Sequence, residues 1–531
     1  MQPSMAPPDL ARISDYVAWY AARMPQAEAL VLGARRLDYA DLAREVDAAA
    51  RSLLAADVRT GDRVAMLSPP NPDFFVVFLA AASIGAVWLG LNPRYQRDEL
   101  QFVLRDSRPK LILARARIGA RDYLEDIEAL QTAAPSARWV MLGGTVAAPG
   151  HLTHEEFIAA GAAVADAALA RARDAVDTHD AALIVYTSGS SGRPKGALLS
   201  HHGLVVCSRV QHRHWATVPL RTVNFFPINH IAAVGDIGCF TLVGGGCMVF
   251  LEQFFPAEAL AILAGERITF WAGVPTMFLL MLRDPAFATA DLSSIQRIIW
   301  SGAAASAELV DALLALGKWL GASYGLTETV GSVTYTDQHA SREVLIETVG
   351  RPPPEYAVRV AEGGRAVGSG TVGEVQVHGS FLMLGYWEKP DATREACDAA
   401  GWLKTGDLGI WRSDGNLAII GRRSDAFKSG GYNVYPREIE RVLECFPGIG
   451  LAAVVAVADP LYGHVGRAYV TPEAHSMLDV DELQRHCRRH LANYKVPKKI
   501  SILADPPMLP VGKIDKRALA ALAASELAAG D

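Results

Sequence analysis

The 531-residue sequence predicts an α/β protein with a large N-terminal region of several layered sheets and a small, mobile α/β C-terminal domain. Short apolar segments, many of them β-branched, alternate with Ala- and Leu-rich segments that have helical spacing. Half of the residues are hydrophobic, so a chain of this length can bury a large core. Ordinary domain sizes therefore indicate three or four folding units.

Buried strands are predicted at residues 63–67, 110–114, 182–186, 247–251 and 297–300, with helices between them at 42–55 and 258–263. Turn signals across 374–420 indicate a smaller β-rich unit. Beyond Ser424, helices at 436–445 and 480–490 flank a strand at 451–458, and an Ala-rich helix ends the chain. We therefore expect an N-terminal domain of residues 1–423 and a C-terminal domain of 424–531 that moves as one body.

Charge and cysteine usage exclude several classes of protein. The formal net charge is -6 and the charges are scattered, so no basic stripe indicates nucleic acid or anionic lipid. Six widely spaced cysteines form no CxxC pair, which favours neither a disulfide framework nor a zinc site and fits a reducing cytoplasm. The N-terminus lacks the pattern of a secretory signal.

An uncharged run at residues 74–91 has about the length of the shortest membrane spans. Pro72 and Asp73 form a helix start before it, and Gly85 and Gly90 interrupt it. We therefore predict a buried helix followed by a core strand, and no membrane span.

The strongest motif is Tyr-Thr-Ser-Gly-Ser-Ser-Gly-Arg-Pro-Lys-Gly at residues 186–196, directly after a predicted strand. Glycines let the backbone approach an anion, hydroxyls and N–H groups donate to its oxygens, and Lys195 adds a positive charge. Pro194 stands where a Walker loop needs glycine, which disfavours a P-loop enzyme. The predicted phosphate-binding residues are Thr187, Ser188, Gly189, Ser190, Ser191, Gly192 and Lys195.

This motif resembles the YTSGTTGxPKG loop of the adenylate-forming (AMP-binding) superfamily, and the chain is most similar to its acyl-CoA synthetase branch. Further segments follow in the family's order: YGLTET at 324–329, TGD at 405–407, Gly421-Arg422 at the hinge region and PVGK at 510–513. Five motifs in order are highly specific. The resemblance implies an acyl-CoA synthetase-like fold and the use of ATP, Mg²⁺ and coenzyme A.

The resemblance also implies roles for the matched residues. Glu328 supplies a carboxylate suited to Mg²⁺ and acts with Thr187 in the reaction. Thr327 contacts the α-phosphate. Tyr324 and Gly325 lie against the adenine, and Asp407 and Arg422 bind the ribose or a phosphate.

Two lysines are expected to serve different half-reactions. Lys513 carries an ammonium that neutralises charge as the acid attacks the α-phosphorus. After rotation of the small domain, Lys428, Gly430 and Gly431 are implied to line the tunnel for the thiol. The chain departs from the family at Ser424, where Asp or Lys usually stands at the hinge.

The acyl pocket is expected to involve residues 226–231, 301–304 and those after Glu328, with His230, Ile231 and Gly302 beside the acid. Gly302 and Ala303 are also expected to contact the nucleotide. No Phe-Asp-x-Ser occurs nearby to pair an α-amino group, so an apolar fatty, aryl or alicyclic acid is favoured over an amino acid. The histidines at 201–202, 212 and 214 are predicted in solvated or loop positions, not as metal ligands, which leaves Mg²⁺ as the expected metal.

The predicted reaction joins a carboxylic acid, ATP and coenzyme A into acyl-CoA, AMP and pyrophosphate through an acyl-adenylate. The nearest alternative loads a carrier-protein phosphopantetheine, and a luciferase-like oxygenase would share the first half-reaction. A non-catalytic scaffold of this fold is expected to lack Lys513, Lys195 or Glu328, all of which are present. Both a monomer and a homodimer remain open.

Overall fold

Two large sheets dominate the N-terminal region of the computed structural model, which describes residues 6–143, 150–187, 194–473, 476–509 and 513–528. Within these residues the first sheet has eight strands in the order β17-β16-β15-β14-β12-β13-β1-β2. Its strands are β1 (Glu28–Leu32), β2 (Arg35–Asp38), β12 (Arg221–Asn224), β13 (Cys247–Phe250), β14 (Phe270–Gly273), β15 (Arg297–Ser301), β16 (Trp319–Leu326) and β17 (Gly331–Tyr335).

The second sheet also has eight strands in the described part of the chain, in the order β21-β11-β10-β4-β3-β5-β8-β9. Its strands are β3 (Arg63–Leu67), β4 (Val87–Leu91), β5 (Leu111–Arg115), β8 (Arg138–Leu142), β9 (Leu152–Thr153), β10 (Ala181–Thr187), β11 (Lys195–Ser200) and β21 (Gly385–Tyr386). β10 pairs in parallel with β4 but antiparallel with β11, so the chain turns back directly after Thr187. A separate hairpin joins β6 (Arg117–Ile118) and β7 (Arg121–Asp122).

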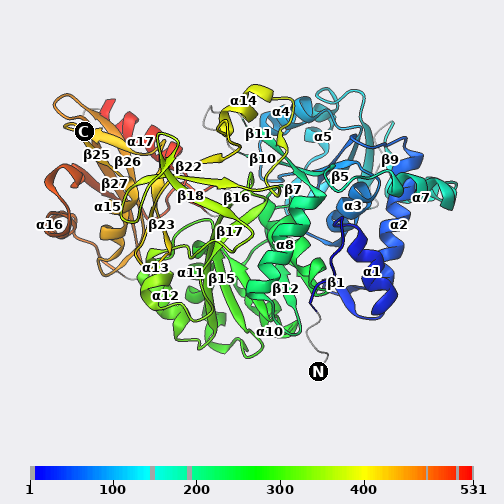
Figure 1. Ribbon diagram of the computed structural model, residues 1–531, viewed down its shortest axis with the longest axis horizontal. Helices are drawn as coiled ribbons and strands as arrows, with labels where there is room; N and C mark the ends of the chain where they lie inside the picture. The colour runs from blue at the N-terminus through cyan, green and yellow to red at the C-terminus, as the bar shows by residue number, and fades with distance from the viewer. Residues whose placement is uncertain (1–5, 144–149, 188–193, 474–475, 510–512, 529–531) are drawn as a thin grey trace.

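Helices cover both sheets (Figure 1). In chain order they are α1 (Asp15–Arg23), α2 (Tyr39–Ala55), α3 (Pro72–Ser83), α4 (Arg97–Ser107), α5 (Leu124–Gln131), α6 (His154–Gly161), α7 (Asp166–Asp174), α8 (His201–Trp215), η1 (Ala232–Cys239), α9 (Phe240–Val243), α10 (Pro256–Gly265), α11 (Pro275–Arg283), η2 (Pro285–Thr289), α12 (Ala307–Leu314), α13 (Arg342–Glu347) and α14 (Pro390–Ala396). The segment η1 is a π-helix.

The apolar run at residues 74–91 is a buried helix, α3, followed by the core strand β4, as predicted. The Asn71 side chain caps α3 by accepting a hydrogen bond from the Phe74 N–H at 3.1 Å, and Pro72 fits the first turn. Phe74 packs against Phe250 of the other sheet with ring centroids 5.8 Å apart. The helix thus joins the two sheets, and none of the described helices is long and apolar enough to cross a bilayer.

A smaller five-stranded sheet, β19-β18-β20-β22-β23, connects the large sheets to the end of the chain. Its strands are β18 (Ala357–Glu362), β19 (Arg365–Ala366), β20 (Gly373–His378), β22 (Leu403–Trp411) and β23 (Leu417–Arg422). This is the β-rich unit expected around 374–420, and it begins earlier, at Ala357.

The C-terminal elements, orange to red in Figure 1, lie together at one end of the molecule. Their hydrophobic clusters consist only of residues from Phe427 onward, which supports the predicted small domain. The elements are β24 (Phe427–Ser429), β25 (Tyr432–Val434), α15 (Pro436–Glu444), β26 (Ile449–Asp459), β27 (Gly463–Pro472), α16 (Val480–His490), η3 (Asn493–Lys495), β28 (Lys499–Ile502) and α17 (Lys516–Ala528).

Among the residues that the structure describes, few ion pairs tie this C-terminal part to the rest. Arg441 of α15 reaches Glu347 of α13 at 3.4 Å, and Arg283 reaches Glu473 at 3.9 Å. All four side chains keep more than a third of their surface exposed. Exposed pairs of this kind contribute about 0–1 kcal/mol each, so they hold the two parts together only weakly.

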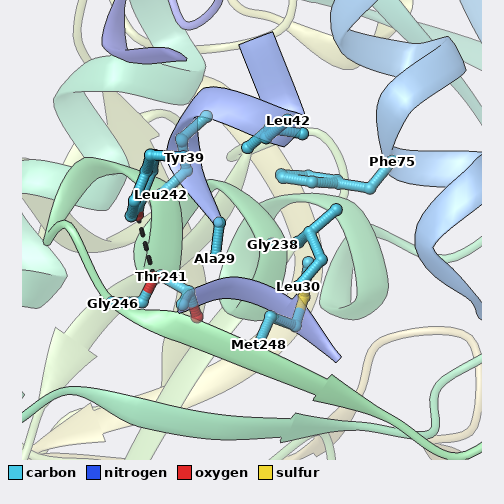
Figure 2. Close-up of a pocket in the computed structure, with 10 residues that line it drawn as sticks. All are labelled: Ala29, Leu30, Tyr39, Leu42, Phe75, Gly238, Thr241, Leu242, Gly246 and Met248. Atoms are coloured by element: carbon cyan, nitrogen blue, oxygen red, sulfur yellow. Dashed lines mark hydrogen bonds between the residues drawn. The ribbon is translucent and has the colours of Figure 1, made fainter. Parts of the chain in front are cut away.

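A small cavity lies between α2, α3 and the first sheet, lined by Tyr39, Phe75 and Met248 among others (Figure 2). The Tyr39 hydroxyl donates to the Gly246 carbonyl at 2.8 Å along its edge. The volume of the cavity is 10 Å³, about the minimum for one water molecule. This cavity is therefore a packing defect and offers no room for a substrate.

Candidate active site

A carboxylate held by two hydroxyls lies where the phosphate loop begins. β10 ends at Thr187, which pairs with Lys195 at the start of β11. The Thr187 hydroxyl donates to Glu328 Oε1 at 3.3 Å, and the Tyr386 hydroxyl donates to the same oxygen at 2.9 Å. The two hydroxyls fix the position of Glu328, whose carboxylate is of the type that suits a hard cation such as Mg²⁺.

Lys195 adds a positive charge beside this carboxylate. Its Nζ lies 5.3 Å from the centroid of the Tyr386 ring. Burial raises the pKa of Tyr386, and the charge of Glu328 raises it further, so the hydroxyl keeps its proton. Of the predicted loop, residues 188–192 lie outside the described residues.

A second cluster lies between β16 and the paired strands β22 and β23. The Tyr324 hydroxyl donates to Asp407 Oδ2 at 2.8 Å, and Arg422 Nε lies 3.1 Å from Asp407 Oδ1. Asp407 and Arg422 face each other because they are register partners across the two strands. Burial raises the pKa of Asp407, and the nearby Arg422 opposes that shift. A carboxylate and a half-exposed guanidinium at one place suit a diol and a phosphate.

Lys513 extends toward this cluster from the end of the chain. Its Nζ lies 3.3 Å from the position that a Cβ on Gly302 would occupy, so a larger residue at 302 would displace it. Gly302 has a φ of +82°, which glycine adopts readily. Burial lowers the pKa of Lys513, the nearby Arg422 lowers it further, and Asp407 opposes both. The ammonium is therefore inserted among the other predicted site residues.

His230 lies close enough to Lys513 to be affected by its charge. Burial and the charge of Lys513 lower the pKa of His230 to about 4, so its imidazole is neutral at pH 7. Its Nδ1 accepts from the Ala232 N–H at 3.1 Å, which fixes the ring at the start of η1. Ile231 is buried beside it, whereas Ala303 is exposed after Gly302. Two of the segments predicted to contact the acid, those of Gly302 and His230, thus lie near Lys513.

The end of β16, which carries the residues predicted to contact the adenine, is closely packed. Gly325 faces the backbone of Gly331, whose carbonyl oxygen lies 2.0 Å from where a Cβ on Gly325 would be. No side chain fits at that position, so the glycine of the YGLTET segment is a steric requirement. Thr327 is buried at the end of the same segment.

The residues predicted for the thiol step lie elsewhere. Lys428 is exposed on β24, and Gly430 and Gly431 have φ angles of +56° and +88° in the turn to β25. The Gly430 N–H donates to the Tyr462 carbonyl at 2.9 Å, so this hairpin contacts its own domain and does not join the cluster around Lys513. Ser424 at the hinge donates to Asp425 Oδ1 at 2.9 Å.

The histidine prediction was partly wrong. His201 and His212 are buried within α8, not in solvated or loop positions. Burial lowers the pKa of each to about 4, so both are neutral packing residues. Within the described residues no group of three His, Cys, Asp or Glu side chains is placed to hold a metal. A single carboxylate such as Glu328 is compatible with Mg²⁺, which binds largely through phosphates and water.

Tyr386 was not predicted from the sequence. Tyr386 holds Glu328 although the two residues are 58 positions apart in the chain. In the sequence, an aromatic residue after Gly385 is only a weak indication of such a contact. The contact exists because β21 pairs with β11, directly beside the phosphate loop.

Comparison with known proteins agrees with this geometry. Residues 17–387 match the family model of the AMP-binding enzyme, and residues 438–513 match that of the AMP-binding enzyme C-terminal domain. A feruloyl-CoA synthase from an Amycolatopsis species is 36% identical over 500 residues, covering 93% of this chain and 96% of the relative. A 3-[(3aS,4S,7aS)-7a-methyl-1,5-dioxo-octahydro-1H-inden-4-yl]propanoyl:CoA ligase from Mycobacterium tuberculosis is 34% identical over 505 residues, covering 93% and 95%.

Among solved structures, ATP-bound MatB from Rhodopseudomonas palustris superposes with a TM-score of 0.85 at 28% identity, covering 96% of this chain and 98% of that one. The large N-terminal and small C-terminal arrangement is therefore shared. The chain belongs to the AMP-binding, adenylate-forming enzyme family and is an ATP-dependent, AMP-forming ligase.

Proposed function

We propose that this enzyme converts an aryl or alicyclic carboxylic acid, ATP and coenzyme A into acyl-CoA, AMP and pyrophosphate through an acyl-adenylate. The observation that carries the proposal is the buried ammonium of Lys513, inserted between Gly302, His230 and the Asp407–Arg422 pair. The named acids of the two relatives, feruloyl and a hydrindane propanoyl group, support the aryl and alicyclic classes over a plain fatty chain.

In the first half-reaction a carboxylate oxygen of the acid attacks the α-phosphorus of ATP, and pyrophosphate leaves. Two anions approach each other in this step, so negative charge builds up at the attacking and leaving oxygens. Lys513 donates to this charge, and its low-dielectric surroundings strengthen the interaction. The neutral imidazole of His230 adds no competing positive charge.

The nucleotide is proposed to bind along the two hydroxyl-rich clusters. Thr187, Lys195 and the loop between them hold phosphates, and Asp407 with Arg422 holds the ribose. Bound Mg²⁺ would neutralise phosphate charge and be held by Glu328, whose orientation depends on Thr187 and Tyr386.

The second half-reaction needs a different arrangement, because Lys513 occupies the approach to the adenylate. Rotation about the hinge at Ser424 would withdraw Lys513 and bring the β24–β25 hairpin toward the site. The weak exposed ion pairs between the two parts support such a rotation. Lys428 and the two glycines after it would then guide the thiol.

The reducing cytoplasm is the proposed compartment, because all six cysteines are free thiols. Free coenzyme A is the proposed acceptor, and a carrier-protein phosphopantetheine is the alternative that the experiment must separate.

The test is mass analysis after incubation with ATP, Mg²⁺, coenzyme A and a panel of aryl, alicyclic and fatty acids. Acyl-CoA formed together with AMP is the expected result. AMP and acyl-adenylate without a coenzyme A thioester would favour the carrier-protein acceptor, and neither product with any acid would contradict the proposal.

A further inference from the structure

A largely buried carboxylic acid, Asp236, lies against β17 and is not used by the chemistry above. Asp236 belongs to η1, six residues after His230. Its Oδ1 lies 2.5 Å from the position that a Cβ on Gly331 would occupy. Gly331 begins β17, three residues after Glu328, and its lack of a side chain leaves this carboxyl uncovered on that side.

No cation compensates this carboxyl. None of the ion pairs among the described residues includes Asp236, and the backbone N–H of Ser332 is the polar group that favours its charge. The neighbouring Cys207, Cys239 and Tyr335 are neutral, because burial raises the pKa of each. Burial raises the pKa of Asp236 itself to about 7. A buried carboxyl with so little compensation costs folding free energy.

Asp236 keeps part of its surface accessible although most of η1 is buried. His230, two residues before η1, lies near Lys513. In and just before η1, three residues keep part of their surface accessible while their neighbours are buried. The accessible residues are His230, Ala232 and Asp236, and the buried ones are Ile231, Ala233, Val234, Gly235 and Ile237.

Polar contacts that alternate between hydroxyl and backbone groups connect Ser301 with the same carboxyl. Ser301, directly before Gly302, donates to the Ser323 carbonyl at 3.0 Å. The Ser323 hydroxyl lies 2.9 Å from that of Ser332, whose N–H faces Asp236. Polar groups therefore lie near Asp236, and the apolar acyl pocket expected from the sequence stays a prediction.

We propose that Asp236 accepts a hydrogen bond from a hydroxyl group at the end of the acid remote from its carboxylate. The inference rests on the proposed function and narrows its substrate to hydroxylated aryl or alicyclic acids. A hydroxyl suits this carboxyl in either protonation state, because both forms keep an acceptor oxygen. A substrate without the hydroxyl leaves the buried acceptor unpaired, which strongly disfavours its binding.

The experiment compares kcat/KM for coenzyme A thioester formation from ferulic acid with that from the same acid lacking its phenolic hydroxyl. We expect the enzyme to prefer the hydroxylated acid by about 100-fold, because the analogue without the hydroxyl leaves the acceptor unpaired. The same pair is measured for Asp236→Leu and Asp236→Asn. Leucine should reduce the preference at least roughly tenfold, whereas asparagine, which keeps an acceptor oxygen, should retain most of it.

An alicyclic acid with and without a ring hydroxyl, and its ketone, form the second arm. The proposal is supported if the unmodified enzyme prefers the hydroxyl compound in either arm and the Asp236→Leu variant loses that preference. An unchanged ratio in both variants, or preference for the ketone, overturns it while acyl-CoA formation still supports the proposed function. No thioester and no AMP from any acid would overturn both. Asp236→Asn keeps the test valid if the leucine variant fails to fold.

Discussion

Lys513 and Lys428 belong to the same small C-terminal part of the chain but have opposite environments. Lys513 is partly buried beside Gly302, and its pKa is lowered by burial and by Arg422. Lys428 is exposed on β24, in a hairpin that contacts Tyr462 of its own domain. With the roles proposed above, the structure corresponds to the arrangement for acid activation, because the hairpin of Lys428 does not join the cluster around Lys513.

The largest expected effect separates the two lysines. Lys513→Ala should slow acyl-adenylate formation by roughly 10²- to 10³-fold, since it removes a charged donor aimed at developing negative charge. Thioester formation from supplied acyl-adenylate should remain within about threefold of the unmodified enzyme. Pyrophosphate release and single-turnover thioester assays measure the two steps.

Lys404→Ala, at an exposed position on β22, is the matched control and should leave both steps unchanged. If Lys513→Ala slowed both half-reactions equally, the proposal that Lys513 serves only adenylation would be wrong.

The converse variant should have a smaller effect. Lys428→Ala should slow the thioester step about 10-fold, equivalent to ~1.4 kcal/mol, while adenylation is unchanged. The same two assays apply. A thioester rate that matches the unmodified enzyme would exclude Lys428 from the second arrangement.

The next largest effect is expected from removing a hydroxyl that holds Glu328 in place. Tyr386→Phe removes one of the two hydroxyls that hold its Oε1 and should lower kcat/KM for adenylation roughly fivefold, or ~1 kcal/mol. The concentration of Mg²⁺ needed for half-maximal rate should rise with it. Tyr469→Phe, which removes a buried hydroxyl of the C-terminal part, is the control; if it has the same effect, the Tyr386 result reflects general destabilisation.

The smallest effect is a shift in the alkaline limb of the pH profile. Lys513 acts as an ammonium, and its pKa lies below the ordinary value of 10.5. Adenylation should therefore fall as the pH rises through that lowered pKa, before a solvated lysine would lose its proton. In Lys513→Arg any remaining activity should lack this limb, because a guanidinium stays protonated. A limb that persists in the arginine variant would assign it to another group.

Local patterns predicted many elements well. β3 at Arg63–Leu67 and α16 at Val480–His490 have the predicted bounds, because apolar spacing there is strong and the ends carry clear signals. The Ala-rich stretch after residue 159 is divided between α6 and α7, since alanine favours helix without marking where one ends.

Within the site, ordered motifs allowed Thr187, Glu328, Asp407 and Lys513 to be selected, and the structure brings the last two together with Tyr324 and Arg422. Their roles stay predictions. Tyr386 and Asp236 were missed because each acts through a partner distant in sequence, and no local pattern reports such a contact. The buried histidines of α8 were missed because a polar residue type does not reveal which helix face it occupies.

The pair between Arg441 and Glu347 has a consequence for the timing of the catalytic cycle. At 3.4 Å and with both side chains accessible to water, it is a contact that dissolved salt screens readily. Moderate ionic strength should therefore speed the exchange between arrangements. If product release by that exchange limits turnover, the steady-state rate should rise with salt even as nucleotide affinity falls, a signature visible in kcat alone.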